Sequence, residues 1–214
     1  MVDIIIDIET LGTMPERPII EIGACAINRK TGAISACFSR RIRSAWNNVD
    51  ELVSYCEAFG ERDFAATVEW WASDPGRRGT LEAIIGHGAG QGGMTLRRAL
   101  LQFGEWVCKT EPDRDRDRIW SNGPAFDIAF LRHAYDFENI PLPWAYWQER
   151  CVRTALEMAN YERGSLGWIE RGPRHRALND ARHEARKLYF SGALGEVSSI
   201  MLRLRQRYDV KANA

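Results

Sequence analysis

The sequence has no excess of charge of either sign, because 29 lysine and arginine residues are balanced by 29 aspartate and glutamate residues. An overall attraction to a polyanion is therefore not indicated, and any binding of nucleic acid has to be local. The five cysteines have no CxxC spacing and no histidine companions, which argues against a zinc site or a disulfide framework. Reduced thiols in a core are the expectation.

Long apolar runs are also missing. No segment approaches the roughly 18 apolar residues that a membrane-spanning helix needs, and no basic segment followed by an apolar stretch opens the chain. We therefore expect a cytoplasmic protein without membrane contact. With 214 residues, 45% of them hydrophobic and 27% charged, the chain is expected to form a single domain over residues 1–214.

Two acids follow an isoleucine-rich segment near the N-terminus. Ile4, Ile5 and Ile6 favour an extended strand, in which side chains alternate between faces. Asp7 and Glu9 then point to the same side, about 7 Å apart along the strand. Such a pair of buried carboxylates repels unless a cation lies between them, and the simplest cation is a divalent metal. The alternative is that both acids are solvated residues at a fraying strand end.

The order of apolar segments predicts the fold class. Strands are expected at 18–27 and 33–42, joined by a hairpin loop at 28–32, so the first three strands form an antiparallel meander. Further strands at 119–121 and 149–154 alternate with helical segments, which indicates added parallel strands in a mixed sheet of α/β type. Helices are predicted at 49–58, 64–72, 94–108, 155–161 and 193–208. A glycine-rich loop is predicted at 76–93, with one helical turn within it as an option.

Two later segments carry acids near expected helix starts. Pro124 suits the first position of a helix, which places Asp127 in its first turn. There the carboxylate can join a metal site or simply complement the helix dipole. His175 and Asp180 are five residues apart and cannot face one site from within a single regular helix. They can do so if His175 precedes the helix and Asp180 lies inside it, and Gly172 and Pro173 support a loop there.

Together the motifs DIET (7–10), NGPAFD (122–127) and HRALND (175–180) make the chain resemble the DEDDh branch of the DnaQ-like 3′–5′ exonuclease superfamily. Arg176 stands where the tyrosine branch of that superfamily carries its tyrosine. The resemblance implies a ribonuclease-H-like fold, with a mixed five-stranded sheet and helices on both faces.

Within the superfamily the sequence is most similar to phage and prophage exonucleases of the T4 DexA and exodeoxyribonuclease VIII type. The similar segments are Trp70–Trp71, Trp120–Asp127, Pro143–Trp147 and Val152–Thr154. A mycobacterial-type exoribonuclease is also similar in the catalytic motifs, so the sugar preference stays open. The glycine-rich segment at 86–93 departs from the family pattern.

The resemblance assigns a role to each residue of the motifs. The resemblance implies two Mg²⁺ ions, because Mg²⁺ favours oxygen ligands. Mn²⁺, which also favours them, is the expected substitute. Asp7 is expected to bind both ions, Glu9 and Asp180 the ion on the side of the attacking water, and Asp127 the second ion. His175 is expected to act as general base, since an ordinary histidine pKa of about 6.5 suits proton removal near neutrality.

The resemblance also implies contacts to the substrate. Leu11 either wedges against a terminal base or packs behind the strand, and Asn122 either contacts substrate or only makes a turn. Adjacent helical residues lie about 100° apart, so at most one of Trp70 and Trp71 faces the cleft. The candidate substrate-binding residues are Thr10, Leu11, Trp70, Trp71, Asn122 and Phe126.

The main hypothesis is a metal-dependent 3′–5′ exonuclease that acts on single-stranded or frayed DNA ends, in the cytoplasm of a bacterium or a phage-infected host, and releases nucleoside 5′-monophosphates. A homodimer is kept as an option. One alternative is an exoribonuclease acting on short RNA or RNA tails. Another is a catalytically silent module that binds nucleic acid. A structural Ca²⁺ site is a third, but it does not explain His175.

Overall fold

A computed structural model describes residues 1–86, 93–110, 113, 115–162, 166, 169 and 172–194. Two expectations therefore fall largely or wholly outside the described residues. These are the helix at 193–208 and the glycine-rich segment at 86–93.

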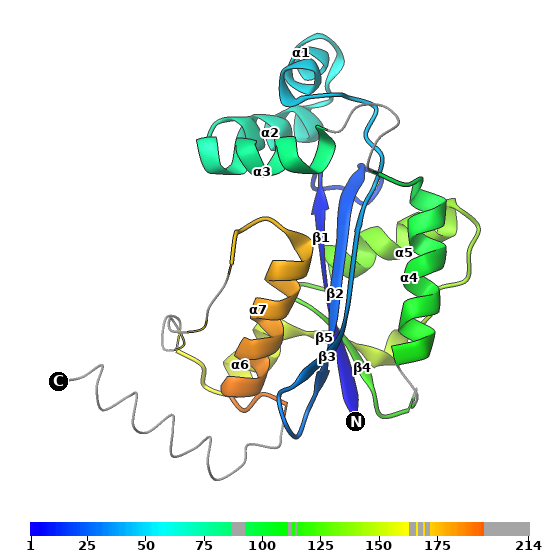
Figure 1. Cartoon of the computed structure of the whole chain (residues 1–214), viewed down its shortest axis with the longest axis vertical. Coiled ribbons are helices and arrows are strands. Elements are labelled where there is room, and N and C mark those ends of the chain that lie inside the picture. The colour runs from blue at the N-terminus through cyan, green and yellow to red at the C-terminus, as the bar shows by residue number, and fades with distance from the viewer. Residues whose placement is uncertain are drawn as a thin grey trace, which may run out of the picture.

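The centre of the fold is a mixed sheet of five strands (Figure 1). Strands β1 (Val2–Thr10), β2 (Ile19–Asn28) and β3 (Ile34–Arg41) form an antiparallel meander. β4 (Arg118–Ser121) pairs in parallel with β1, and β5 (Glu149–Cys151) pairs in parallel with β4. The order β3-β2-β1-β4-β5 makes β1 the central strand. The predicted mixed five-stranded sheet is thus confirmed.

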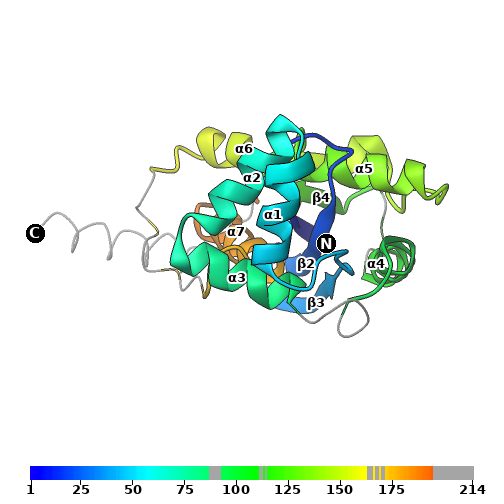
Figure 2. The ribbon, with the colours of Figure 1, turned by 90° about the horizontal axis from the view of Figure 1, so that it is seen from above.

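Helices cover both faces and one end of this sheet. Figures 1 and 2 show α4 and α5 on one face, α6 and α7 on the other, and α1 to α3 above the end where β1 finishes. No helix in the described part of the chain is long and apolar enough to cross a membrane. The helices are α1 (Val49–Phe59), α2 (Arg62–Ala72), α3 (Pro75–Ile85), α4 (Leu96–Thr110), α5 (Asp127–Phe137), a 3₁₀ turn (Tyr146–Gln148), α6 (Val152–Met158) and α7 (Ala177–Phe190).

The alternation of side chains along β1 determines which face carries the acids. Ile4, Ile6 and Ile8 pack in the core beneath α4 and α5. Ile5 packs with residues of α6 and α7 on the opposite face. Because side chains alternate along a strand, Asp7 and Glu9 share the face of Ile5 and point toward α7.

Helix α3 is the main correction to the predicted elements, because residues 76–93 were expected to form a loop. The side chain of Asp74 accepts the N–H of Arg77, and Pro75 occupies the first helical turn. Leu81, Ile84 and Ile85 are buried on one side of the helix. This capping and burial outweigh the low helix propensity of glycine.

Smaller shifts occur elsewhere. α5 begins at Asp127 and not at Pro124, and β5 gives way to α6 already at Val152. Boundary differences of this size are common because helix ends are set by caps and by tertiary contacts.

Candidate active site

The acids of β1 lie where α7 approaches the sheet most closely. Asp7 is paired across the strands with Gly23 of β2, and Glu9 is paired with Glu21. A Cβ atom on Gly23 would lie 2.1 Å from the backbone nitrogen of Leu178. Only a glycine at this position lets the first turn of α7 lie against the strand beside the two acids.

Glu21 fixes the start of α7. Its carboxylate accepts the backbone N–H of Ala177 at 3.0 Å and forms a salt bridge with Arg176 at 2.9 Å. It thereby satisfies an N–H group that has no partner within the helix. Since Glu21 is almost completely buried, this contact ties the helix to the sheet.

His175 and Asp180 are brought together in the predicted way. His175 precedes α7 in a left-handed backbone conformation, with φ of 56°, and Asp180 lies in the first turn of the helix. The backbone N–H of His175 donates to Oδ2 of Asp180 at 2.8 Å. Ligand atoms of Glu9, His175 and Asp180 all lie within 4.8 Å of one another.

Asp127 reaches the same region from the other side of β1. It is the first residue of α5 and is 4% exposed. α5 follows β4, which runs parallel to β1, so the carboxyl ends of both strands deliver acids to one end of the sheet. This is the edge at which ligands bind in many α/β folds.

The acids influence one another strongly. Burial raises the pKa of Asp7 well above its ordinary range, and Asp127, Glu9 and Asp180 raise it further. The pKa of Glu9 is also raised, first by burial and then by Asp180 and Glu21. Burial raises the pKa of Asp127 to about 6, although hydrogen bonds from the backbone of Gly123 and Ile8 partly oppose the rise. The four carboxylates therefore form one cluster of mutually repelling charges.

A cavity of about 470 Å³ opens beside these acids, lined by the end of β1, one side of α2 and Phe126. Thr10 and Phe126, two of the candidate substrate-binding residues, are among its lining residues. Trp70 is 42% exposed, and its ring centroid lies 5.1 Å from that of His175. Trp71 also lines the cavity, but Trp70 is the more exposed of the two tryptophans.

For three other candidate substrate contacts, the structure favours the packing or turn alternative that the sequence had left open. Trp71 is only 2% exposed and donates its indole N–H to the carbonyl of Thr10 at 3.1 Å, so it packs and positions the strand end. Leu11 is completely buried in the cluster under α1 to α3 and cannot wedge against a base. Asn122 is exposed outside the cavity lining, and its carbonyl accepts Nε of Arg153 at 2.7 Å. Its part is in the turn after β4.

Sequence reasoning missed two acids near the site. Glu21 was visible only as a lone charge within an apolar strand. Glu184 lies one helical turn after Asp180, is almost completely buried and pairs with Lys187 at 2.8 Å. Its charge contributes to the raised pKa of Asp7. The four-residue spacing from Asp180 was the available signal.

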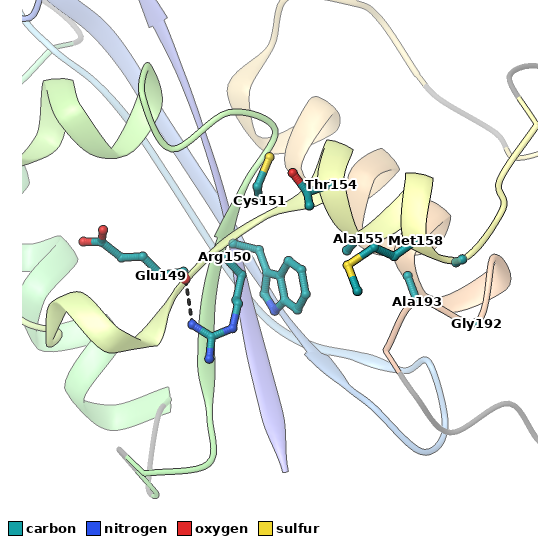
Figure 3. Close-up of a pocket in the computed structure, with 10 residues that line it drawn as sticks. Glu149, Arg150, Cys151, Thr154, Ala155, Met158, Gly192 and Ala193 are labelled. Atoms are coloured by element: carbon teal, nitrogen blue, oxygen red, sulfur yellow. Dashed lines mark hydrogen bonds between the residues drawn. The ribbon is translucent and has the colours of Figure 1, made fainter.

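A second cavity, of about 460 Å³, lies at the opposite edge of the sheet between β5, α6 and the end of α7 (Figure 3). Of the described residues in its lining, only Glu149 carries a carboxylate, and its side chain points away from Met158 in Figure 3. That carboxylate is bound by Arg132 at 2.6 Å and by the indole of Trp144 at 2.9 Å. The cavity therefore offers no cluster of acids.

Comparison with known proteins supports a nuclease fold. Residues 2–191 match the model of a family described as the 3′–5′ exoribonuclease Rv2179c-like domain. No curated protein matches the chain.

Solved exonucleases share the architecture. The nuclease domain of 3′hExo, a DEDDh family member bound to rAMP, is 17% identical over 88% of this chain and 90% of that chain, with a TM-score of 0.56. E. coli Exonuclease I in complex with a dT13 oligonucleotide is 12% identical over 96% of this chain and 43% of that chain, with a TM-score of 0.60. Exonuclease X in complex with 5′ overhanging duplex DNA is 15% identical over 94% of this chain and 98% of that chain, with a TM-score of 0.50. At these identities the similarity shows the fold, which is the ribonuclease-H-like fold expected from the sequence.

Proposed function

We propose a function from the premise that this chain belongs to the family of Rv2179c-like 3′–5′ exoribonuclease domains. The protein hydrolyses phosphodiester bonds from the 3′ end of a nucleic-acid strand and releases nucleoside 5′-monophosphates. The observation that carries this proposal is the cluster of Asp7, Glu9, Asp127 and Asp180 at the end of β1, with His175 beside it.

The cluster suits divalent cations. Its donors are carboxylate oxygens, which Mg²⁺ and Mn²⁺ favour, and their mutual repulsion is relieved by positive charge. We assign Glu9 and Asp180 to one ion, Asp127 to a second, and Asp7 to both. When bound, two such ions stabilise negative charge on the attacking and leaving oxygens of the phosphodiester.

His175 acts as the general base. Its ring packs against Trp70 and Trp71 in T-shaped arrangements, at centroid distances of 5.1 and 5.5 Å. Such packing restricts the orientation of the imidazole, as removal of a proton from a positioned water requires. Its distance from Glu9 and Asp180 also suits a metal ligand. The base and the ligand roles make different predictions for a variant, given below.

The terminal nucleotide occupies the cavity beside Trp70. The exposed indole offers a stacking surface for a base without selecting its identity. Thr10 and Phe126 form the wall nearest the acids.

RNA is the first candidate substrate, because the description of the matching family names an exoribonuclease. DNA, which the sequence alone favours, is the second. The likeness to phage and prophage exonucleases stays a prediction, as does the organisation of residues 1–214 as one domain.

The test uses 5′-labelled RNA and DNA oligonucleotides of matched sequence, each with a free or a blocked 3′ end. With Mg²⁺ or Mn²⁺ we expect a ladder of products shortened from the 3′ end, nucleoside 5′-monophosphates, and resistance of the blocked strands. EDTA and Asp7→Ala should both abolish the ladder. Equal degradation of blocked and free strands would replace the exonuclease by an endonuclease.

A further inference from the structure

A polar groove lies next to the candidate active site, between the edge strand β3 and the start of α4. Its volume is about 460 Å³. Four arginines line it: Arg40 and Arg41 at the end of β3, Arg98 in α4, and Arg176 before α7. Among the described residues, the single carboxylate in the lining is that of Glu21, which is already bound by Arg176 and by the N–H of Ala177. The groove therefore has an excess of positive charge, although the chain as a whole has none.

The strand register connects this groove to the catalytic acids. Glu9 is opposite Glu21, and Glu21 is in turn opposite Arg41. Residues directly opposite on neighbouring strands lie roughly 4.5–5.5 Å apart and point to the same face. Glu9, Glu21 and Arg41 are therefore neighbours in one row across the sheet, which connects the acids of the site to the groove. Arg176, the residue after His175, provides a second connection.

Neighbouring groups hold several of the guanidinium groups in place. Arg41 donates through Nη1 to the carbonyl of Ala83 at 2.7 Å, and Arg40 donates through Nε to Gln102 at 2.7 Å. Each guanidinium carries five N–H donors, so these contacts leave donors that can face the groove. Arg98 is exposed on the first turn of α4.

We propose that this arginine groove binds backbone phosphates of the substrate strand on the 5′ side of the bond that is cut. The inference rests on the proposed exonuclease function. The Trp70 cavity would hold the terminal nucleotide, the cations bound by the acids would hold the scissile phosphate, and the groove would hold the phosphates that follow. Guanidinium groups bind phosphate oxygens with two parallel hydrogen bonds. Because phosphates carry no sequence information, the groove strengthens binding without selecting bases.

The test measures binding without turnover. Fluorescence anisotropy with a fluorescein-labelled RNA decamer in EDTA is recorded from 50 to 200 mM KCl for the wild type, Arg98→Gln and Arg41→Gln/Arg98→Gln. Arg97→Gln is the matched control, because it removes the same charge from the same helix while its guanidinium is bound to the carbonyl of Glu138 at 2.5 Å, outside the groove. We expect the double variant to raise the Kd about tenfold, and each lost phosphate contact to reduce the slope of log Kd against log salt by about 0.7.

A second readout separates the groove from the catalytic centre. With Mg²⁺, the ratio of kcat/KM for the decamer to kcat/KM for a dinucleotide should fall in Arg98→Gln, whose exposed side chain can be replaced without disturbing the core. The ratio in Arg97→Gln should match that of the wild type.

Three results would overturn the groove. The first is that the groove variants have the same Kd and salt slope as Arg97→Gln. The second is an equal loss of kcat/KM for the dinucleotide and the decamer. The third is that the variants lose inorganic phosphate binding at constant ionic strength while the decamer still binds normally. If the variants lose decamer binding but the wild type hydrolyses no substrate, the groove stands and the proposed function fails.

Discussion

Asp3 and Asp7 lie on the same face of the same strand, yet their surroundings are opposite. The carboxylate of Asp3 is completely buried and accepts two N–H groups of Arg29, at 2.7 and 2.5 Å, and the backbone N–H of Arg118 at 3.0 Å. Asp7, four residues later, is influenced by Asp127, Glu9 and Asp180. One end of β1 therefore balances its buried negative charge, and the other end accumulates it.

The difference shows that burial alone does not mark a functional acid. Burial raises the pKa of Asp3 as well, but Arg29 opposes that rise. At Asp7 the neighbouring carboxylates add to the effect of burial. An arrangement of this kind destabilises the fold without bound cations, and functional sites are where such a cost is commonly retained.

The largest expected effect is on catalysis, from a substitution at the Asp7 end of β1, where the acids repel one another. Asp7→Ala should reduce turnover to the background rate, because it removes the proposed ligand of both ions. The melting temperature without metal should stay the same or rise, since the change relieves repulsion among the acids. Initial rates with Mg²⁺ and thermal melts in EDTA measure the two effects. Near-wild-type Mg²⁺-dependent activity would rule out the assignment of Asp7.

His175→Ala is expected to lower kcat by about 10²–10⁴-fold, which is the usual contribution of a positioned general base. A base must be neutral to accept a proton, so the wild-type rate should fall as the pH drops through the pKa of His175 in the substrate complex. The variant should lack this acidic limb and keep its metal affinity. If it instead lost metal binding as severely as Asp180→Ala, His175 would be a ligand and not the base.

At the Asp3 end of β1, where Arg29 balances the buried charge, a substitution should lower stability and leave catalysis intact. Asp3→Ala leaves Arg29 without its carboxylate, and breaking a buried ion pair in this way costs about 3–5 kcal/mol of unfolding free energy. Urea titrations measure the loss, and assays at low temperature should give wild-type activity for each folded molecule. Asp3→Ala/Arg29→Met, which removes both charges, should recover part of the stability. Lost activity in a folded Asp3→Ala protein would show that the two ends are not independent.

The smallest expected effect is a pH dependence of stability in the metal-free protein. The pKa of Asp127 rises from 3.8 to about 6 on folding, so the folded state holds its proton more tightly than the unfolded state does. Unfolding free energy should therefore fall as the pH rises from about 4 through 6, by on the order of 1–3 kcal/mol. Thermal melts in EDTA across this range measure it. Asp127→Asn should reduce this fall without abolishing it, because the pKa values of Asp7 and Glu9 are raised as well. A profile that rises over the same range in the wild type would contradict the assignment.

The parts of the molecule that could be predicted from sequence are those with local causes. The isoleucines of β1 fix its alternation and hence the shared face of Asp7 and Glu9. The loop residues before α7 indicated how His175 and Asp180 could meet. The arginine groove could not be predicted, because it brings Arg41, Arg98 and Arg176 together from three separate elements.

What the sequence left open or missed has tertiary causes as well. Leu11 follows the acids directly, but whether it meets substrate or core depends on α1 to α3 packing over it. The glycines of α3 suggested a loop, while burial of its apolar side chains favours a helix.

Calorimetric titration with Mn²⁺ tests the central claim most directly, because it asks whether the acids at the end of β1 form a cation site. We predict two ions bound per wild-type chain near neutral pH, loss of binding in Asp7→Ala, and unchanged stoichiometry in Asp3→Ala/Arg29→Met. No binding to the wild type, or the same binding in Asp7→Ala as in the wild type, would contradict the account.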